Sequence, residues 1–251
     1  MTGSIVNSKI IVSKNIDELS EHFAGILVHG VDASINFFNI AISGGSTPKA
    51  VFDYLAVNYK SKIDWQKVKL FWGDERCVPP DHSESNYKMT YESLISRIEI
   101  PPQNIFRIHG ENNPVEEAKN YAKVIAENIP VDSNLPRFDL IMLGLGEDGH
   151  TASIFPDRLE LIESNDICAA VEHPSSKQKR ITLTGKVINN SVKIVFLVTG
   201  KNKSKTVDTI LSKRGGYELQ PASFINPTNG ELIWLLDLEA AEKFKHNLEG
   251  Y

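Results

Sequence analysis

The segment FFNIAISGGSTPKAVFDYLAV, residues 37–57, joins a short apolar run to a helical pattern through a Gly-Gly-Ser-Thr turn. The apolar run is typical of a strand that is buried on both faces of a parallel sheet. Pro48 favours the first turn of the following helix, because the backbone N–H that proline lacks would have no partner there. The segment therefore predicts a strand, a tight turn and a helix in succession, which is the unit of an α/β fold.

The same alternation continues through most of the 251 residues. Strands are predicted at 9–13, 67–75 and 138–146. Helices are predicted at 16–33, 113–129, 201–212 and 83–96, the last with Ser83 as its N-cap. Two strands around a short helical or turn segment are predicted at 179–200, and a final strand and helix at 231–244. The pattern indicates one domain over residues 1–251, a three-layer αβα fold whose mainly parallel, Rossmann-like open sheet has helices on both faces.

Composition restricts the class of protein. Hydrophobic residues make up 41% and charged residues 24% of the chain, as in ordinary globular proteins, and the net charge of -5 argues against nucleic-acid or membrane-surface partners. Cys77 and Cys168 are far apart and suit a reducing compartment rather than a disulfide framework or zinc site. No apolar run approaches the roughly 20 residues that cross a bilayer, and the N-terminus lacks a signal-peptide pattern, so a cytoplasmic location is expected.

Four polar clusters follow predicted strands, at residues 44–47, 73–76, 146–150 and 200–203. The carboxyl ends of parallel strands share one edge of an open sheet, and ligands bind in the crevice there. A single polar, glycine-rich loop would carry little weight, because loops after strands often have this composition. Four such loops together predict a shared binding site.

The first cluster has the composition of an anion cradle. Gly44 and Gly45 let the backbone approach a ligand, Ser46 and Thr47 offer hydroxyl groups, and the next helix presents free N–H groups. The sequence is neither a Walker A motif nor G-x-G-x-x-G, which disfavours ATP and NAD. A tight turn with an N-cap would have the same composition, so this interpretation also stays open.

Basic side chains in the other clusters are candidates for binding a phosphate or carboxylate. Arg76 can form a forked pair of charge-assisted hydrogen bonds, although it could instead neutralise the neighbouring acids Asp74 and Glu75. Arg180 and Lys203 are weaker candidates, because a single basic residue is usually a solvated surface charge.

His150 is the candidate catalytic base, since histidine titrates near neutrality and can accept and return a proton. Asp148 could orient its imidazole; the alternative is a histidine at a helix start that bonds only to backbone. No G-x-S-x-G or H-E-x-x-H pattern occurs, so direct activation of water is the simplest mechanism. The remaining histidines lie in predicted helices or solvated loops and have no comparable setting: His22, His29, His82, His109, His173 and His246.

Several long motifs occur in a fixed order: ISGGSTP, FWGDERCVPPDHSESNYKM, GLGEDGHTASIFP, RITLTGKVINNS and VTGKNK. Together they resemble the 6-phosphogluconolactonases over nearly the whole chain. The glucosamine-6-phosphate deaminases of the same superfamily share the glycine loop, the aspartate after the second strand and the D-G-H turn. In those deaminases, however, D-G-H is followed by a segment that ends in Asn-Glu-Pro and supplies a catalytic glutamate. Here Ile154, Phe155 and Pro156 stand at these positions, and WGDER replaces the deaminase form MDEY.

The resemblance implies hydrolysis of 6-phospho-D-glucono-1,5-lactone to 6-phosphogluconate, without a metal or organic cofactor. It implies catalysis by His150 with Asp148, and substrate or phosphate binding by Gly44, Gly45, Ser46, Asp74, Arg76, Arg180 and Lys203. The expected partner is a small sugar-phosphate lactone, with no nucleic acid and no membrane, and the expected assembly is a monomer or a homodimer. A glucosamine-6-phosphate deaminase or a non-catalytic sugar-phosphate-binding relative remains the alternative.

Overall fold

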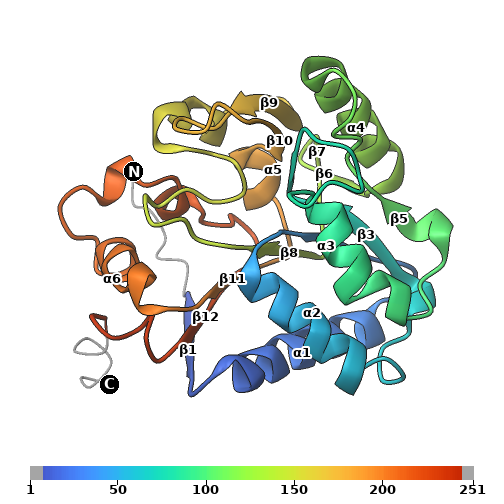
Figure 1. The fold of residues 1–251 in the computed structure, drawn as a ribbon, viewed down its shortest axis with the longest axis horizontal. Helices are drawn as coiled ribbons and strands as arrows, with labels where there is room; N and C mark the ends of the chain where they lie inside the picture. The colour runs from blue at the N-terminus through green and yellow to red at the C-terminus, as the bar shows by residue number, and fades with distance from the viewer. Residues whose placement is uncertain (1–7, 245–251) are drawn as a thin grey trace.

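The computed structural model describes residues 8–244, which are built around a seven-stranded sheet (Figure 1). The strands lie in the order β1-β12-β11-β8-β2-β3-β5, and all neighbours are parallel, which confirms the predicted parallel sheet. Their bounds are β1 Lys9–Ser13, β2 Phe38–Ile42, β3 Val68–Trp72, β5 Ile105–Phe106, β8 Leu140–Leu143, β11 Lys193–Val198 and β12 Glu231–Asp237. Every residue of β2 and β8 is buried, as expected for strands covered on both faces.

Helices cover both faces of this sheet. Their bounds are α1 Ile16–Ala33, α2 Ser46–Asn58, α3 Asn86–Ser93, α4 Pro114–Asn128, α5 Gly185–Asn189 and α6 Ser204–Leu211. Figure 1 shows α1 and α2 side by side below the sheet, with α5 above it. This arrangement confirms the three-layer α/β fold. In the described part of the chain, no helix combines the length and the apolar character needed to cross a membrane.

A second, antiparallel sheet lies beside α5 and consists of β4 Asp74–Arg76, β10 Lys179–Leu183 and β9 Cys168–Glu172. The prediction of one strand over 67–75 is therefore wrong, because the chain changes sheets at Gly73. The N–H of Gly73 donates to Ile42 of the main sheet at 2.7 Å, whereas its carbonyl accepts from the N–H of Leu183 in β10 at 2.8 Å. Gly73 thus carries β4, with Asp74 and Arg76, away from the main sheet.

The start of α3 also differs from the prediction, since its N-cap is Ser85 rather than Ser83. The Ser85 hydroxyl accepts from the N–H of Lys88 at 3.1 Å. In addition, the Glu75 carboxylate accepts from the N–H groups of Asn86 and Tyr87, both at 2.8 Å. A carboxylate from β4 therefore helps to set where this helix begins.

Two differences concern the last third of the chain. The predicted helix at 201–212 begins with a 3-10 turn over Lys201–Lys203 before α6. After β12, residues 238–244 form turns instead of the predicted helix. The Asp237 carboxylate accepts from the N–H groups of Gly200 and Ala240, which folds the chain back after the strand.

A further difference lies in the middle of the chain. A short hairpin, β6 Val131–Asp132 with β7 Leu135–Pro136, was not predicted.

The strand order creates one point at which the direction of winding reverses. From β2 the chain moves outward to β3 and β5, and it then returns to β8 on the other side of β2. The loops after β2 and β8 consequently lead away from each other. A crevice at the carboxyl ends of these two strands is where open α/β sheets bind ligands.

Candidate active site

A cavity of about 220 Å³ lies at this reversal point, between the loops that follow β2 and β8. It brings together most of the residues singled out from the sequence: Gly44, Gly45, Asp74, Arg76, His150, Arg180 and Lys203. Two others lie outside its lining. Asp148 is bonded to His150, and Ser46 lines two neighbouring cavities together with Thr47.

Asp148 and His150 form a hydrogen-bonded pair, with 2.6 Å between Oδ1 and the imidazole Nδ1. Burial alone would raise the pKa of Asp148, but the hydrogen bond and charge of His150 outweigh it and lower that pKa to about 2. The ionised carboxylate accepts a hydrogen bond from Nδ1–H, which leaves Nε2 as the ring nitrogen that can accept a proton. Only about a quarter of the His150 side chain is exposed. The pair is therefore arranged to take up a proton at Nε2.

The turn that carries this pair is bonded on several sides. Gly149 has a φ of +83°, a conformation that glycine adopts without strain. The Thr206 hydroxyl of α6 donates to the carbonyl of Glu147 at 2.7 Å, and the N–H of Ala222 donates to the carbonyl of Gly149 at 2.9 Å. These contacts hold His150 in one position relative to the cavity.

Gly146 lies so close to the pair that a side chain there would disturb it. A Cβ at this position would be 2.1 Å from His150 Nδ1 and 2.5 Å from Asp148 Oδ1. We expect Gly146→Ala to lower kcat by about 10²-fold, the scale of loss that follows a 1 Å misplacement of a catalytic group. Steady-state kinetics and thermal unfolding of this variant and of Gly25→Ala, where a Cβ meets nothing within 4 Å, provide the test. A kcat within threefold of wild type would contradict this account of Gly146.

Arg76 and Arg180 face each other across the small sheet as directly paired residues of β4 and β10. Like charges in such a pair repel each other. The Nε atoms of both side chains are buried without a hydrogen-bond partner, although Arg76 Nη1 donates to the carbonyl of Glu84 at 2.6 Å. Burial lowers the pKa of Arg180, while nearby Asp74 acts in the opposite direction. An anionic ligand would supply both the countercharge and the missing acceptors.

Asp74 and Asn86 complete the wall between the arginines and the glycine loop. Asp74 is buried, and its Oδ2 accepts from the hydroxyl of Ser153 at 2.7 Å. Asn86 Nδ2 donates to the backbone carbonyl of Asp74 at 2.9 Å. A Cβ at Gly44 would be 1.8 Å from Asn86 Oδ1, so a side chain at this position would displace the Asn86 carboxamide. Asn86 and Ser153 were not singled out from the sequence, although both stand inside the long motifs.

Phe155 is fully buried behind the cavity and touches both ends of the site. Its ring centroid is 5.0 Å from that of His150, and the Arg180 guanidinium lies 5.7 Å from it. His173 packs edge-on against the same ring at 5.0 Å, although its sequence context predicts only a helix or a solvated loop. His173 does not line the cavity. The glucosamine-6-phosphate deaminases described above have an acid at this position. In this chain, the apolar ring of Phe155 fills it instead.

Comparison with known proteins agrees with this geometry. Residues 14–234 match the family described as glucosamine-6-phosphate isomerases/6-phosphogluconolactonase. A 6-phosphogluconolactonase of Treponema pallidum is 39% identical over 204 residues, which are 80% of this chain and 85% of that protein.

Two solved structures share the fold. The 6-phosphogluconolactonase of Trypanosoma brucei is 30% identical, with a TM-score of 0.83 over 94% of this chain and 98% of that one. A monomeric glucosamine-6-phosphate deaminase is 20% identical, with a TM-score of 0.78 over 94% and 99%, and this likeness shows the fold alone. From the family match and the Treponema relative together, the chain belongs to the glucosamine-6-phosphate isomerase/6-phosphogluconolactonase family.

Proposed function

We propose that this chain hydrolyses 6-phospho-D-glucono-1,5-lactone to 6-phospho-D-gluconate, with His150 as the general base. The observation that carries the proposal is the layout of the cavity. His150, which is bonded to Asp148, and two arginines with unused buried donors line the same small space. The relatives named as 6-phosphogluconolactonases support the choice of substrate.

In this mechanism a water molecule attacks the lactone carbonyl carbon while His150 Nε2 removes one of its protons. A tetrahedral oxyanion forms, and backbone N–H groups of the Gly44-Gly45 loop would stabilise it or bind sugar hydroxyls. The helix α2 that follows has no side chain bonded at its N-cap, Gly45, so N–H groups remain free at this edge. The bond from the carbonyl carbon to the ring oxygen then breaks, and the imidazolium returns its proton to that oxygen. Ionised Asp148 stabilises the imidazolium throughout.

At the other end of the substrate, Arg76, Arg180 and Lys203 would bind the phosphate. The phosphate takes no part in the chemistry, so its binding energy serves to orient the lactone over His150. Asp74 is bonded to Ser153 and Asn86, and we assign it to the sugar-binding wall rather than to proton transfer.

The alternative within the family is deamination of glucosamine 6-phosphate. Ring opening of an amino sugar requires a further proton-transferring group beside the D-G-H turn in the related deaminases. The phenyl ring of Phe155 cannot transfer a proton, and it is fully buried. This position favours the lactonase.

A two-substrate assay tests the proposed activity. We expect freshly prepared 6-phosphogluconolactone to be consumed well above its spontaneous rate, while glucosamine 6-phosphate releases no ammonia. Coupling the first reaction to 6-phosphogluconate oxidation and the second to ammonia detection gives both rates on one protein preparation. Turnover of the amino sugar without turnover of the lactone would reverse the assignment.

We further propose that residues 1–251 act as one domain, in the cytoplasm, as a monomer or a homodimer, and without a cofactor. Cys77 and Cys168 are both free thiols, which supports a reducing compartment.

A further inference from the structure

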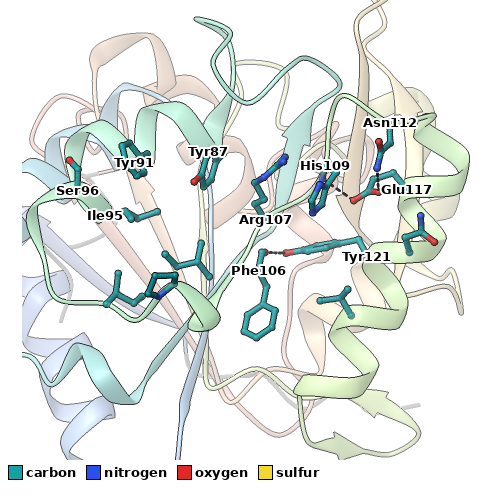
Figure 2. Close-up of a pocket in the computed structure, with 15 residues that line it drawn as sticks. Tyr87, Tyr91, Ile95, Ser96, Phe106, Arg107, His109, Asn112, Glu117 and Tyr121 are labelled. Atoms are coloured by element: carbon teal, nitrogen blue, oxygen red, sulfur yellow. Dashed lines mark hydrogen bonds between the residues drawn. The ribbon is translucent and has the colours of Figure 1, made fainter.

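A larger cavity, of about 740 Å³, lies on the other side of α3 from the proposed active site. It is a groove between α3 and α4 at the β5 edge of the main sheet (Figure 2), and we call it the α3–α4 groove. Its volume is within the range of about 300–1,000 Å³ that is typical of small-molecule sites. None of the residues proposed to act on the lactone lines it.

One wall of the groove, on α3, is aromatic. Tyr87 and Tyr91 project from one face of α3, with ring centroids 6.1 Å apart, and Figure 2 shows both rings directed into the groove. Phe106 of β5 also lines the groove, whereas Tyr121 of α4 is only 1% exposed beneath it. Tyr91 is 47% exposed, so part of its ring is open to an occupant of the groove. Such a wall suits a flat ring that stacks against it.

One end of the groove holds a buried acid. The side chain of Glu117 is only 3% exposed, and its two carboxylate oxygens accept from the N–H of His109 at 2.8 Å and from Asn112 Nδ2 at 2.9 Å. Among residues 8–244, no basic side chain forms an ion pair with it. Each oxygen can accept a further hydrogen bond, so an occupant with an N–H group could donate to this carboxylate.

The nearby cations are already neutralised. Arg107 makes a forked ion pair with Glu111, with N–O distances of 2.9 and 2.7 Å, and this contact raises the pKa of Arg107. His109 Nδ1 also lies 3.6 Å from the same carboxylate. The charge of Glu111 is balanced by Arg107, whereas no ion pair among residues 8–244 balances Glu117. The groove therefore favours a neutral or cationic occupant over an anion.

From these features we propose that the α3–α4 groove binds a flat heteroaromatic ring that bears an amino group, of the class found in aminopurine nucleosides. The ring stacks on the tyrosines of α3, and its amino group donates to Glu117. The neutralised Arg107 leaves no site for a phosphate, so a nucleoside binds more tightly than its nucleotide.

Helix α3 connects the groove to the proposed active site. Asn86 lines the lactone cavity and Tyr87 lines the groove, and the N–H groups of both residues donate to the Glu75 carboxylate. Glu75 is buried, and its neighbour Arg76 lines the lactone cavity. A ring that shifts Tyr87 therefore shifts Asn86 and β4 with it, so binding at the two sites is coupled. This coupling rests on the proposed function, whereas the binding site itself does not.

Isothermal titration with three probes tests the site: adenosine, purine riboside, which lacks the amino group, and adenosine 5′-monophosphate. We expect saturable binding of one adenosine per chain, with a Kd at least about tenfold lower than that of purine riboside, as for one hydrogen bond to a charged acceptor. The monophosphate should bind more weakly than adenosine. Absence of saturable adenosine binding up to millimolar concentration, or equal affinity for the two nucleosides, would overturn the proposal.

Variants locate the binding. Tyr91→Ala removes an exposed ring, and we expect it to raise the Kd for adenosine at least about fivefold, the lower end of base–aromatic stacking losses. Glu117→Gln should abolish the preference for adenosine over purine riboside. Ile35→Ala, at a side chain that is 94% exposed outside the groove, is the matched control and should leave the Kd unchanged. If Glu117→Gln fails to fold, Tyr91→Ala still decides, because an unchanged Kd in that variant would place adenosine elsewhere.

The coupling is measured by repeating the adenosine titration in saturating 6-phosphogluconate. We expect the Kd to change, and the Kd for 6-phosphogluconate to change by the same factor when adenosine is saturating, since coupling of binding is reciprocal. Adenosine binding that is unaffected by bound 6-phosphogluconate would overturn the coupling through α3. If 6-phosphogluconate itself does not bind, the proposed lactonase function fails, and the adenosine titrations still decide the site.

Discussion

Replacement of His150 with alanine is expected to lower kcat for lactone hydrolysis by about 10²–10⁴-fold, the usual contribution of a general base. KM should change little, because the phosphate remains bound by groups at the other end of the cavity. The reason for the large effect is geometric. The Asp148 carboxylate holds Nδ1 at 2.6 Å, so Nε2 is the only basic atom that the pair presents.

Because the lactone also opens spontaneously in water, the rate of each variant must be corrected for the reaction without enzyme. His22→Ala is the matched control, since this histidine is exposed on α1 and should be dispensable. Thermal unfolding of both variants separates a catalytic loss from a folding defect. A corrected kcat for His150→Ala within a few-fold of wild type would show that another group activates the water.

The second large effect is expected for Arg76→Ala. We predict an increase of about 10–100-fold in KM for the phosphorylated lactone, as for the loss of one or two charge-assisted hydrogen bonds, with a smaller effect on kcat. Activity on gluconolactone without the phosphate should change by less than about threefold, because that substrate never uses the arginine. The preference of the enzyme for the phosphorylated substrate should therefore fall.

Steady-state kinetics on both lactones provide the measurement. Arg214→Ala is the control, because Arg214 is an exposed arginine whose ion-pair partner is Asp208, away from the cavity. An unchanged preference for the phosphorylated lactone in Arg76→Ala would mean that Arg76 does not bind the substrate. Its role would then be structural, through the hydrogen bond to the carbonyl of Glu84.

Periodicity and turn chemistry predicted the layers of the fold well, since they act within one segment. The strand at 38–42 and the helix after it follow directly from their apolar residues and from Pro48. The break at Gly73 and the start of α3 were not predicted, because both depend on partners far away in the sequence. Gly73 bonds to Leu183, and the first N–H groups of α3 bond to Glu75.

The charged residues at strand ends were predictable as a group, because parallel strands place their carboxyl ends together. The way in which these side chains face each other could not be predicted. The pairing of Arg76 with Arg180 depends on the antiparallel register of the small sheet, which no local pattern encodes. Asn86 and Ser153 were missed because they are uncharged and do not stand directly at the end of a predicted strand. The role of Phe155 could be inferred only because the related deaminases have an acid at this position.

A structure of this chain with 6-phosphogluconate bound tests the central claim most directly, because it shows both ends of the reaction product at once. We predict that the phosphate oxygens lie within hydrogen-bond distance of Arg76 and Arg180. The carboxylate formed from the lactone carbonyl should lie about 3 Å from His150 Nε2. The reverse orientation, with the carboxylate on the arginines and the phosphate at His150, or a product bound outside this cavity, would contradict the assignment of the site.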